Sequence, residues 1–202
     1  IMPGYISEID YFGTSDLEFV EIAVPTGTDV SSYTLVLYQS DGTIYKTLSL
    51  GTSTGTFAGQ DVYVVDQSTP GFDSGGDSMG TFYPDDAVAL VDDSGTVLQF
   101  ISWEGNTVSA VEGPANGTTS SNAGVADESL QSDNGGSSYY AQSSSNKGSV
   151  PCYAPGTLID TPNGPRAVET LRPNDLVLTL DHGPQPIRWV RSYDQILEKV
   201  GV

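Results

Sequence analysis

The sequence predicts an all-β protein whose larger part is an antiparallel β-sandwich. Short runs rich in apolar residues recur between Tyr5 and Trp103, and turn-forming residues separate them at the spacing typical of sandwiches. No stretch shows helical periodicity for more than two turns, and the density of Gly, Ser and Thr disfavours helices. A smaller β-rich part follows the only cysteine, Cys152.

Seven strands are expected in the larger part, at Ile6–Tyr11, Leu17–Val24, Tyr33–Tyr38, Ile44–Leu50, Asp61–Val65, Ala87–Val91 and Val97–Trp103. The Asp-Gly pair at 41–42 strongly favours a tight hairpin between the third and fourth strands, and residues 92–95 join the last two. In the second strand Phe19 and Glu21 would share one face, because side chains alternate along a strand. Such a set of short strands predicts two packed sheets.

Charge is distributed unevenly along the chain. The formal net charge is -19, and residues 1–150 carry almost all of it, with two Lys and Arg against twenty Asp and Glu. Residues 151–202 are nearly balanced, with five against six. So acidic a surface repels a nucleic-acid backbone, and we expect no DNA or RNA partner. A length of 202 residues with 37% apolar content suffices for a folded core.

Residues 104–150 differ from the part before them. Asn, Gly, Ser and Ala dominate, apolar residues are sparse, and we expect only Leu130, Tyr139 and Tyr140 to anchor this part of the chain. We expect a long loop and linker that is partly ordered against the sandwich. Asn116-Gly117-Thr118 matches the glycosylation pattern, and in this composition chance explains the match better than modification.

Several short motifs in the first part resemble a bacterial lamin-tail domain. They are Ile6–Ile9, Glu18–Ile22, Val30–Leu35, Asp85–Val91, Gly95–Val97 and Asp127–Gln131. The resemblance implies an immunoglobulin-like β-sandwich that serves as an interaction or accessory module. We therefore expect a sandwich domain over 3–131, a linker over 132–150 and a second domain over 151–202.

The second domain opens at Cys152, where short apolar runs broken by proline begin. These runs predict strands at Gly156–Thr161, Arg166–Leu171, Leu176–Leu180 and, after a loop at Asp181–Pro186, Ile187–Val190. In this order they resemble the first half of a Hint domain of the bacterial type, the fold shared by hedgehog autoprocessing domains and inteins. The residues that carry the resemblance are Cys152, Pro155–Ile159, Gly164, Val168–Leu171, Asp175–Val177 and Asp181–Trp189.

The Hint resemblance implies chemistry on the chain's own backbone. In that family the first cysteine attacks the carbonyl before it and converts the amide into a thioester, which here assigns the attack to Cys152 and the carbonyl to Pro151. Cys152 is therefore the candidate catalytic residue, and the chain itself is the substrate. The alternative for Cys152 is a small buried side chain without chemistry.

The acid–base help that this step needs comes, in the family, from a later Thr/Ser-x-x-His segment. Thr179-Leu180-Asp181-His182 has that spacing, but it aligns with an earlier part of the Hint pattern. We expect His182 to be a loop histidine, with the catalytic segment beyond Val202 and this fragment inactive. The incomplete Hint half would then pair with a second copy of the chain, pack on the sandwich, or be poorly ordered.

Other site types have weaker support. Carboxylates lie near turns at Asp73–Asp77, Asp85–Asp86 and Asp92–Asp93, where solvated acids are the main interpretation and weak calcium binding is the alternative. No other cofactor is expected. A single histidine excludes a histidine-based metal site and a Ser-His-Asp triad with a supporting histidine.

Location is constrained by what the sequence lacks. No apolar run approaches the ~18 residues that a membrane span requires, and the first residues show no basic and apolar signal-peptide regions. One cysteine excludes an internal disulfide. We expect secretion or cell-surface display by a leaderless route, with a cytoplasmic location as the alternative.

Two hypotheses of different class follow. In the first, the chain is part of a bacterial autoprocessing protein whose Hint domain cleaves or transfers the preceding sandwich by an N–S acyl shift at Pro151–Cys152. In the second, the chain is a non-enzymatic binding or structural module with an inert Hint-like tail. A continuation of the chain into a Thr/Ser-x-x-His strand would favour the first.

Overall fold

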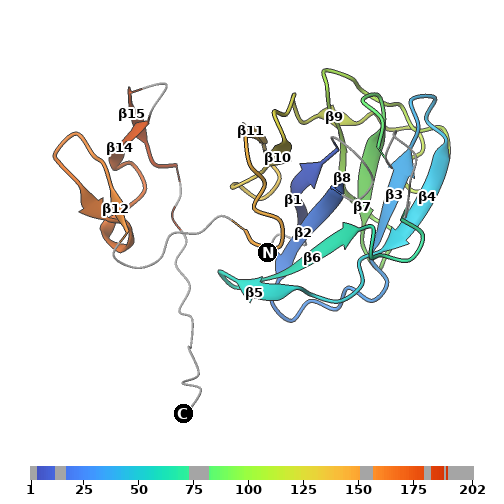
Figure 1. The fold of residues 1–202 in the computed structure, drawn as a ribbon, viewed down its shortest axis with the longest axis horizontal. Coiled ribbons are helices and arrows are strands. Elements are labelled where there is room, and N and C mark those ends of the chain that lie inside the picture. Colours follow the sequence, from blue (N-terminus) through green and yellow to red (C-terminus); the bar gives the residue numbers. More distant parts are fainter. Residues whose placement is uncertain are drawn as a thin grey trace, which may run out of the picture. The chain divides into compact units, whose positions relative to one another are not determined.

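The computed structural model describes residues 4–11, 17–72, 82–150, 157–179, 183–188 and 190. These residues form β-strands and one short 3-10 turn without any α-helix, which confirms the predicted all-β class. The chain divides into two compact units, Ile1–Val150 and Pro151–Val202. We call them the sandwich unit and the C-terminal unit, and Figure 1 shows the strands of each.

The first sheet of the sandwich unit has six strands in the order β11-β10-β1-β2-β6-β5, and all neighbours are antiparallel. The strands are β1 (Tyr5–Asp10), β2 (Phe19–Pro25), β5 (Gly55–Phe57), β6 (Gln60–Asp66), β10 (Ser129–Gln131) and β11 (Tyr140–Gln142). The central strands β1, β2 and β6 match the predicted ones within two residues. The sequence did not predict β5, β10 and β11, each of which has only three residues.

The second sheet has five strands in the order β4-β3-β7-β8-β9. They are β3 (Thr34–Tyr38), β4 (Ile44–Ser49), β7 (Ala87–Val91), β8 (Val97–Ser102) and β9 (Ser121–Asn122). The pairing of β8 with β9 is parallel, which departs from the predicted purely antiparallel arrangement. A parallel pair needs a long crossover connection, and residues 103–120 supply it.

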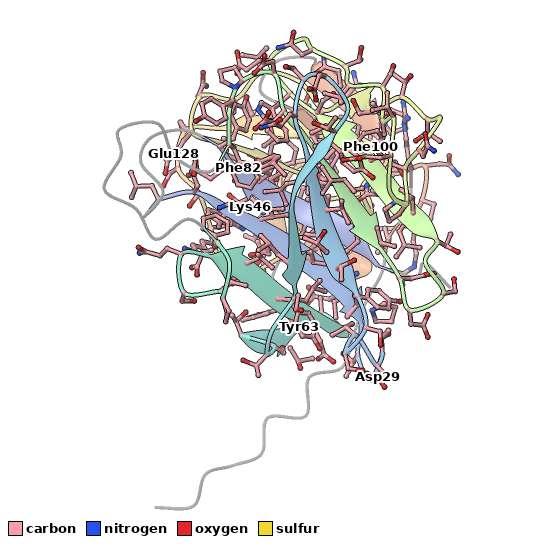
Figure 2. All side chains as sticks on the ribbon, turned by 90° about the vertical axis from the view of Figure 1, so that its right-hand side faces the viewer. Asp29, Lys46, Tyr63, Phe82, Phe100 and Glu128 are labelled. Atoms are coloured by element: carbon pink, nitrogen blue, oxygen red, sulfur yellow. The ribbon has the colours of Figure 1, made fainter. Side chains whose placement is uncertain are left out.

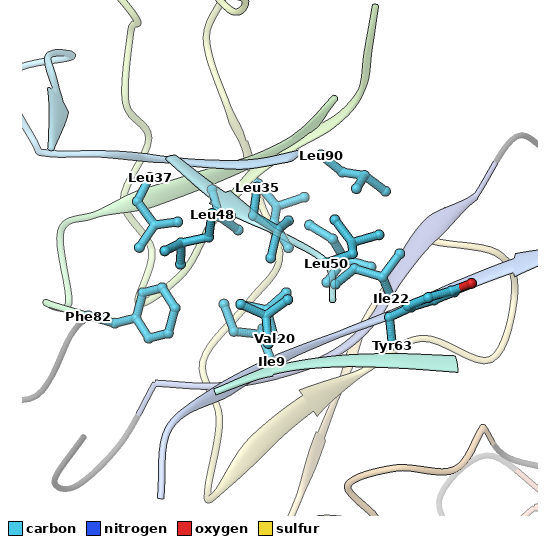
Figure 3. Packing of buried hydrophobic residues seen from close by; sticks show 14 of the residues in the cluster. Ile9, Val20, Ile22, Leu35, Leu37, Leu48, Leu50, Tyr63, Phe82 and Leu90 are labelled. Atoms are coloured by element: carbon cyan, nitrogen blue, oxygen red, sulfur yellow. The ribbon is translucent and has the colours of Figure 1, made fainter. Parts of the chain in front are cut away.

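The main core lies between the two sheets (Figure 3). The leucines of the second sheet, together with Leu50 just after β4, face the first sheet. The residues that they meet there are Ile9, Val20, Ile22 and Tyr63. At one end Trp103 stacks on Tyr11 with 5.1 Å between ring centroids, and its edge meets Phe82. These contacts between side chains of both sheets make the unit a β-sandwich, as the sequence predicted.

The outer face of the second sheet is covered by residues 104–120. Val108, Ala110 and Ala115 pack with Tyr38 and Phe100 in a separate buried cluster, and Figure 2 labels Phe100 among the side chains of this unit. The Tyr38 hydroxyl donates to the carbonyl of Glu112 (3.1 Å) and accepts from the Ala115 N–H (3.1 Å). The predicted loop is therefore ordered over the outer face of β3, β7 and β8, and Val108, Ala110 and Ala115 anchor it, which the sequence did not predict.

The predicted hairpin at Asp41-Gly42 is present and has a second role. Gly42 has φ +84, and a Cβ on it would lie 2.0 Å from the backbone oxygen of Ser109. Its carbonyl accepts the N–H of Val111 at 3.0 Å. Only glycine allows both the left-handed conformation and this close approach of the covering loop.

The described residues of the C-terminal unit form two short hairpins. Strands β12 (Leu158–Ile159) and β13 (Arg166–Ala167) form the first, and β14 (Leu176–Thr179) and β15 (Gly183–Pro186) form the second. A 3-10 turn, η1 (Val168–Thr170), replaces the second half of the strand predicted at Arg166–Leu171. The predicted loop at Asp181–Pro186 was wrong in its second part, because Gly183–Pro186 pairs with β14.

Candidate functional site

The residues that the sequence assigned to chemistry, Pro151, Cys152 and His182, lie outside the described residues, as does the acidic stretch 73–77. The structure does describe the chain immediately before Pro151. We call residues 143–150 the junction segment, because they connect β11 to the start of the C-terminal unit. The contacts of this segment define the surroundings of the candidate site on its N-terminal side.

Two backbone N–H groups of the junction segment donate to carboxylates on the outer face of the first sheet. The Asn146 N–H donates to Oε1 of Glu8 on β1 at 3.3 Å, and the Gly148 N–H donates to Oε2 of Glu21 on β2 at 2.7 Å. Glu8 and Glu21 are opposite each other in the β1–β2 register, and both are fully buried. The junction segment therefore crosses adjacent strands rather than leaving the sheet.

Neighbouring polar side chains complete this arrangement. Ser7 donates to Oε1 of Glu21 at 2.7 Å, and Ser129 on β10 donates to Oε1 of Glu8 at 2.6 Å. The amide of Gln131 donates to the Asn146 side chain at 2.6 Å. Strands β10, β1 and β2 thus all contribute to one buried polar network under the junction segment.

Lys147 ties the segment to the next strand. Its Nζ lies 2.6 Å from Oδ2 of Asp66 at the end of β6 and 5.0 Å from the centre of the Phe19 ring. Phe19 shares the outer face of β2 with Glu21, as the sequence predicted, and both are buried because the segment covers them. An ion pair that also contacts an aromatic face is more favourable than an isolated surface pair.

The junction segment ends in an apolar contact. Val150 is 5% exposed and packs with Tyr5, Ala23 and Val62 in a small cluster apart from the main core, and the half-buried Phe57 lies against it. Burying a valine side chain contributes about 1.5 kcal/mol or more. The last residue before Pro151 is therefore fixed to strands β1, β2 and β6.

Burial changes the titration of the two carboxyls. Desolvation raises the pKa of Glu21 to about 7, although the hydrogen bonds from Ser7 and Gly148 oppose this shift. Desolvation also raises the pKa of Glu8, and nearby Asp10 and Glu128 add to it. Within the described residues, Oε2 of Glu8 is buried and has no hydrogen-bond partner.

The first hairpin of the C-terminal unit is built around polar contacts. In its turn Thr161 donates to the carbonyl of Gly164 at 2.6 Å, and Gly164 has φ +100, which explains the Asn-Gly sequence there. The Arg166 guanidinium donates to Oδ2 of Asp175 at 2.9 Å and to the carbonyl of Thr170 at 2.7 Å. These contacts order the chain from β13 to the start of β14.

The second hairpin bears on the Thr179-x-x-His182 pattern. Thr179 is paired with Gly183 at the end of the β14–β15 ladder, and its hydroxyl donates to the Gly183 carbonyl at 2.9 Å. The Leu178 N–H donates to the Asp160 carbonyl, which links the two hairpins. The hydroxyl of Thr179 thus has a structural hydrogen bond across the hairpin.

Large apolar side chains of the C-terminal unit are unusually exposed. Leu158 is 66% exposed, and Leu176 and Leu178 are each 46% exposed. Among the described residues of this unit, Leu171 is the one buried large aliphatic side chain. The described hairpins therefore present apolar surface of the kind that marks interaction sites.

The acidic turns of the sandwich have partners of their own. Oδ2 of Asp86 accepts from the Tyr45 hydroxyl and the Tyr83 N–H, and burial raises the pKa of this carboxyl to about 6. Oδ1 of Asp92 accepts the Ser94 hydroxyl and the N–H groups of Thr96 and Ser94, which hold the pKa of Asp92 below its usual range. Within the described part of the chain, no three His, Cys, Asp or Glu side chains gather as metal ligands would.

Comparison with known families identifies the smaller unit. The model of the Hint domain family matches residues 151–199, beginning at Pro151, the residue before the only cysteine. The protein is thus an all-β chain whose C-terminal part contains a Hint domain. Searches of curated proteins and of solved structures gave no significant match. Across the described residues, no helix is long and apolar enough to cross a membrane.

Sequence reasoning did not identify the junction segment or the carboxylates beneath it. A signal was present, since Glu21 lies between Val20 and Ile22 and Glu8 precedes Ile9 inside a predicted strand. Acidic side chains at such positions normally face solvent, so a covering segment cannot be deduced from the strands alone. The segment itself, Ser-Ser-Asn-Lys-Gly-Ser-Val after residue 143, has a composition typical of linkers.

Proposed function

We propose that the chain is part of an autoprocessing protein in which the Hint domain cleaves or transfers the preceding β-sandwich at Pro151–Cys152. The observation that carries this proposal is the position of the Hint family match, which begins at Pro151, where the composition changes and the compact sandwich unit ends. Cleavage at the start of the Hint match would therefore release the preceding sandwich as an intact folded domain.

The reaction is an N–S acyl shift. The Cys152 sulfur adds to the Pro151 carbonyl carbon, the C–N bond breaks, and the thiol proton ends on the freed α-amino group of Cys152. Water or another thiol or amine then takes the acyl group from the thioester, and the Cys152 thiol is restored. The thioester is less stable than the amide, so the step needs a proton donor for the leaving nitrogen and donors for the tetrahedral oxygen.

In this proposal the 202-residue chain is itself inactive. Thr179 is engaged across the β14–β15 hairpin, which supports a structural part for the Thr179-x-x-His182 pattern. General acid–base help is typically worth ~10²–10⁴ in rate. The exposed Leu158, Leu176 and Leu178 support the further proposal that the C-terminal unit packs on additional chain or on a second copy.

The test compares the 202-residue chain with a chain extended through the family's later Thr/Ser-x-x-His segment. Both are incubated with dithiothreitol, and intact masses are measured over time. The proposal expects the extended chain to release a fragment ending at Pro151 and the shorter chain to stay intact. Cys152→Ala should abolish release, and His182→Ala should leave it unchanged.

The outcomes separate the hypotheses. Cleavage of the 202-residue chain that His182→Ala stops would assign the chemistry to His182 instead. An extended chain that stays intact would leave the second class, a binding or structural sandwich with an inert tail. Within the first class we propose that the sandwich is a lamin-tail-like accessory module of a secreted bacterial protein, on the resemblance of its strand motifs.

A further inference from the structure

The junction segment has more contacts with the sandwich than a linker needs. Within residues 146–150, two backbone N–H groups donate to carboxylates, Lys147 forms an ion pair, and Val150 packs in an apolar cluster. These contacts fall on three adjacent strands of the first sheet, β1, β2 and β6. The buried ends of Glu8 and Glu21 have no role in the main core, which lies on the opposite face.

The contacts end one residue before the proposed scissile bond. Val150 is buried against Tyr5, Ala23 and Val62, and the next peptide unit leads to the Pro151 carbonyl that Cys152 would attack. Proline fixes its own φ near -65°. With Val150 fixed by packing and φ of Pro151 fixed by its ring, few backbone torsions remain free on the acyl side of that bond.

We propose that the outer face of the first sheet is a positioning site for autoprocessing, in which Glu8, Glu21 and the Val150 cluster fix the acyl side of the Pro151–Cys152 bond. This inference rests on the proposed function. Reducing the free torsions next to a reacting carbonyl lowers the entropy lost on reaching the attack geometry, and such losses are large in intramolecular reactions. The sandwich thereby acts as a recognised substrate and not as passive cargo.

Specificity follows from the same contacts. A different domain fused before Pro151 would lack the acidic outer face and the cluster that receives Val150. Its junction would be a free chain with more conformations, so its release would be slower. The residues involved are positioning residues, since none of them touches the reacting atoms.

The test uses the extended, cleaving chain and three variants. Val150→Asp removes the apolar contact and places a charge in the cluster of Tyr5, Ala23 and Val62. Lys147→Met removes the ion pair but keeps an apolar side chain. Val150→Ile keeps the apolar contact. Val111→Asp is the matched control, because Val111 is 58% exposed and lies in the other covering loop. Release is followed by intact mass at increasing thiol concentration, up to the plateau that reports the acyl shift alone.

We expect the plateau rate to fall on the order of tenfold for Val150→Asp and less for Lys147→Met. Val150→Ile and Val111→Asp should match the parent chain. Amide hydrogen exchange on the same proteins should show faster exchange at Asn146 and Gly148 in the two slow variants, with the β2–β6 amides still protected. That second readout separates loosening of the segment from unfolding of the sandwich.

Each contrary result has one meaning. Faster exchange at Gly148 with an unchanged plateau rate would show that the segment is only structural and would overturn the positioning role. An equal loss of rate in Val111→Asp would overturn it too, since added charge anywhere would then suffice. If the parent chain itself releases nothing, the proposed function fails and the positioning role fails with it.

Discussion

The two units of this chain bury their apolar residues to very different extents. In the sandwich unit the inner faces of both sheets are buried and loops cover the outer faces of their central strands, so that strands such as β1 and β7 are buried at every residue. In the C-terminal unit the described strands have two to four residues, and the leucines of β12 and β14 are 46–66% exposed. The first has a large buried core of its own, whereas the described residues of the second include one buried large aliphatic side chain, Leu171.

The difference shows where low-complexity sequence contributes to stability. Residues 104–120 and 143–150 are rich in Ser, Gly and Asn, yet they cover the outer faces of the two sheets. Their contribution comes from a few side chains, such as Ala115 and Val150, and from backbone hydrogen bonds. The C-terminal unit has no such covering among its described residues.

The largest expected effect contrasts a leucine from each unit. Leu35→Ala removes a fully buried side chain from the main core and should lower the free energy of unfolding by about 2–5 kcal/mol. Leu178→Ala removes a side chain that is 46% exposed and should change it by less than ~0.5 kcal/mol. Urea denaturation followed by circular dichroism measures both, and equal losses would contradict the contrast.

A smaller effect concerns pH. The pKa of Glu21 is raised to about 7 from 4.5, so the folded state binds more protons than the unfolded state between these values. The contribution of Glu21 to the free energy of unfolding is therefore fully present below about pH 4.5. It is lost as pH rises through 7, which lowers the free energy of unfolding by up to about 3 kcal/mol.

The matched variant for this prediction is Glu21→Gln, which keeps an acceptor for the Gly148 N–H but has no charge. The stability of this variant should therefore fall less between pH 4.5 and 7 than that of the parent chain. Burial also raises the pKa of Asp86 to about 6, so Asp86 should account for part of the fall that remains. Urea midpoints at pH 5 and pH 8 measure the difference. A parent chain that becomes more stable over this range would refute the assignment.

The smallest expected effect is that of calcium. Asp92 already accepts hydrogen bonds from its own turn, as a solvated turn acid does. We therefore expect little or no rise in melting temperature at millimolar calcium, whereas a ligand present far above its dissociation constant stabilises by several kcal/mol. A rise that Asp92→Asn removes would instead identify a site.

The sequence was sufficient to predict the sandwich because its central strands are strongly patterned. Leu35, Leu37, Val88 and Leu90 lie in apolar runs bounded by turn residues, and those strands form as predicted. The three-residue strands β5, β10 and β11 carry too few residues to produce a period, so only pairing with a neighbour defines them. The parallel β8–β9 pair depends on a crossover that no local pattern encodes.

The candidate site was predicted less completely, for two physical reasons. Cys152 was identified through motif order and the composition change, and its role stays a prediction. Glu8 and Glu21 became candidates only in three dimensions, because their burial depends on a segment more than a hundred residues away in the sequence. Contacts between residues so far apart produce no periodic pattern in the local sequence.

The central claim is that the sandwich unit, including its junction segment, folds by itself, whereas the described hairpins of the C-terminal unit leave large apolar side chains exposed. The direct measurement is the urea denaturation of residues 1–151, followed both by circular dichroism and by fluorescence of Trp103, the one tryptophan of this fragment. The account predicts one cooperative transition that coincides for the two probes, and a lower midpoint for residues 1–142, which lack the junction segment. A gradual or absent transition for residues 1–151, or equal midpoints for the two fragments, would contradict it.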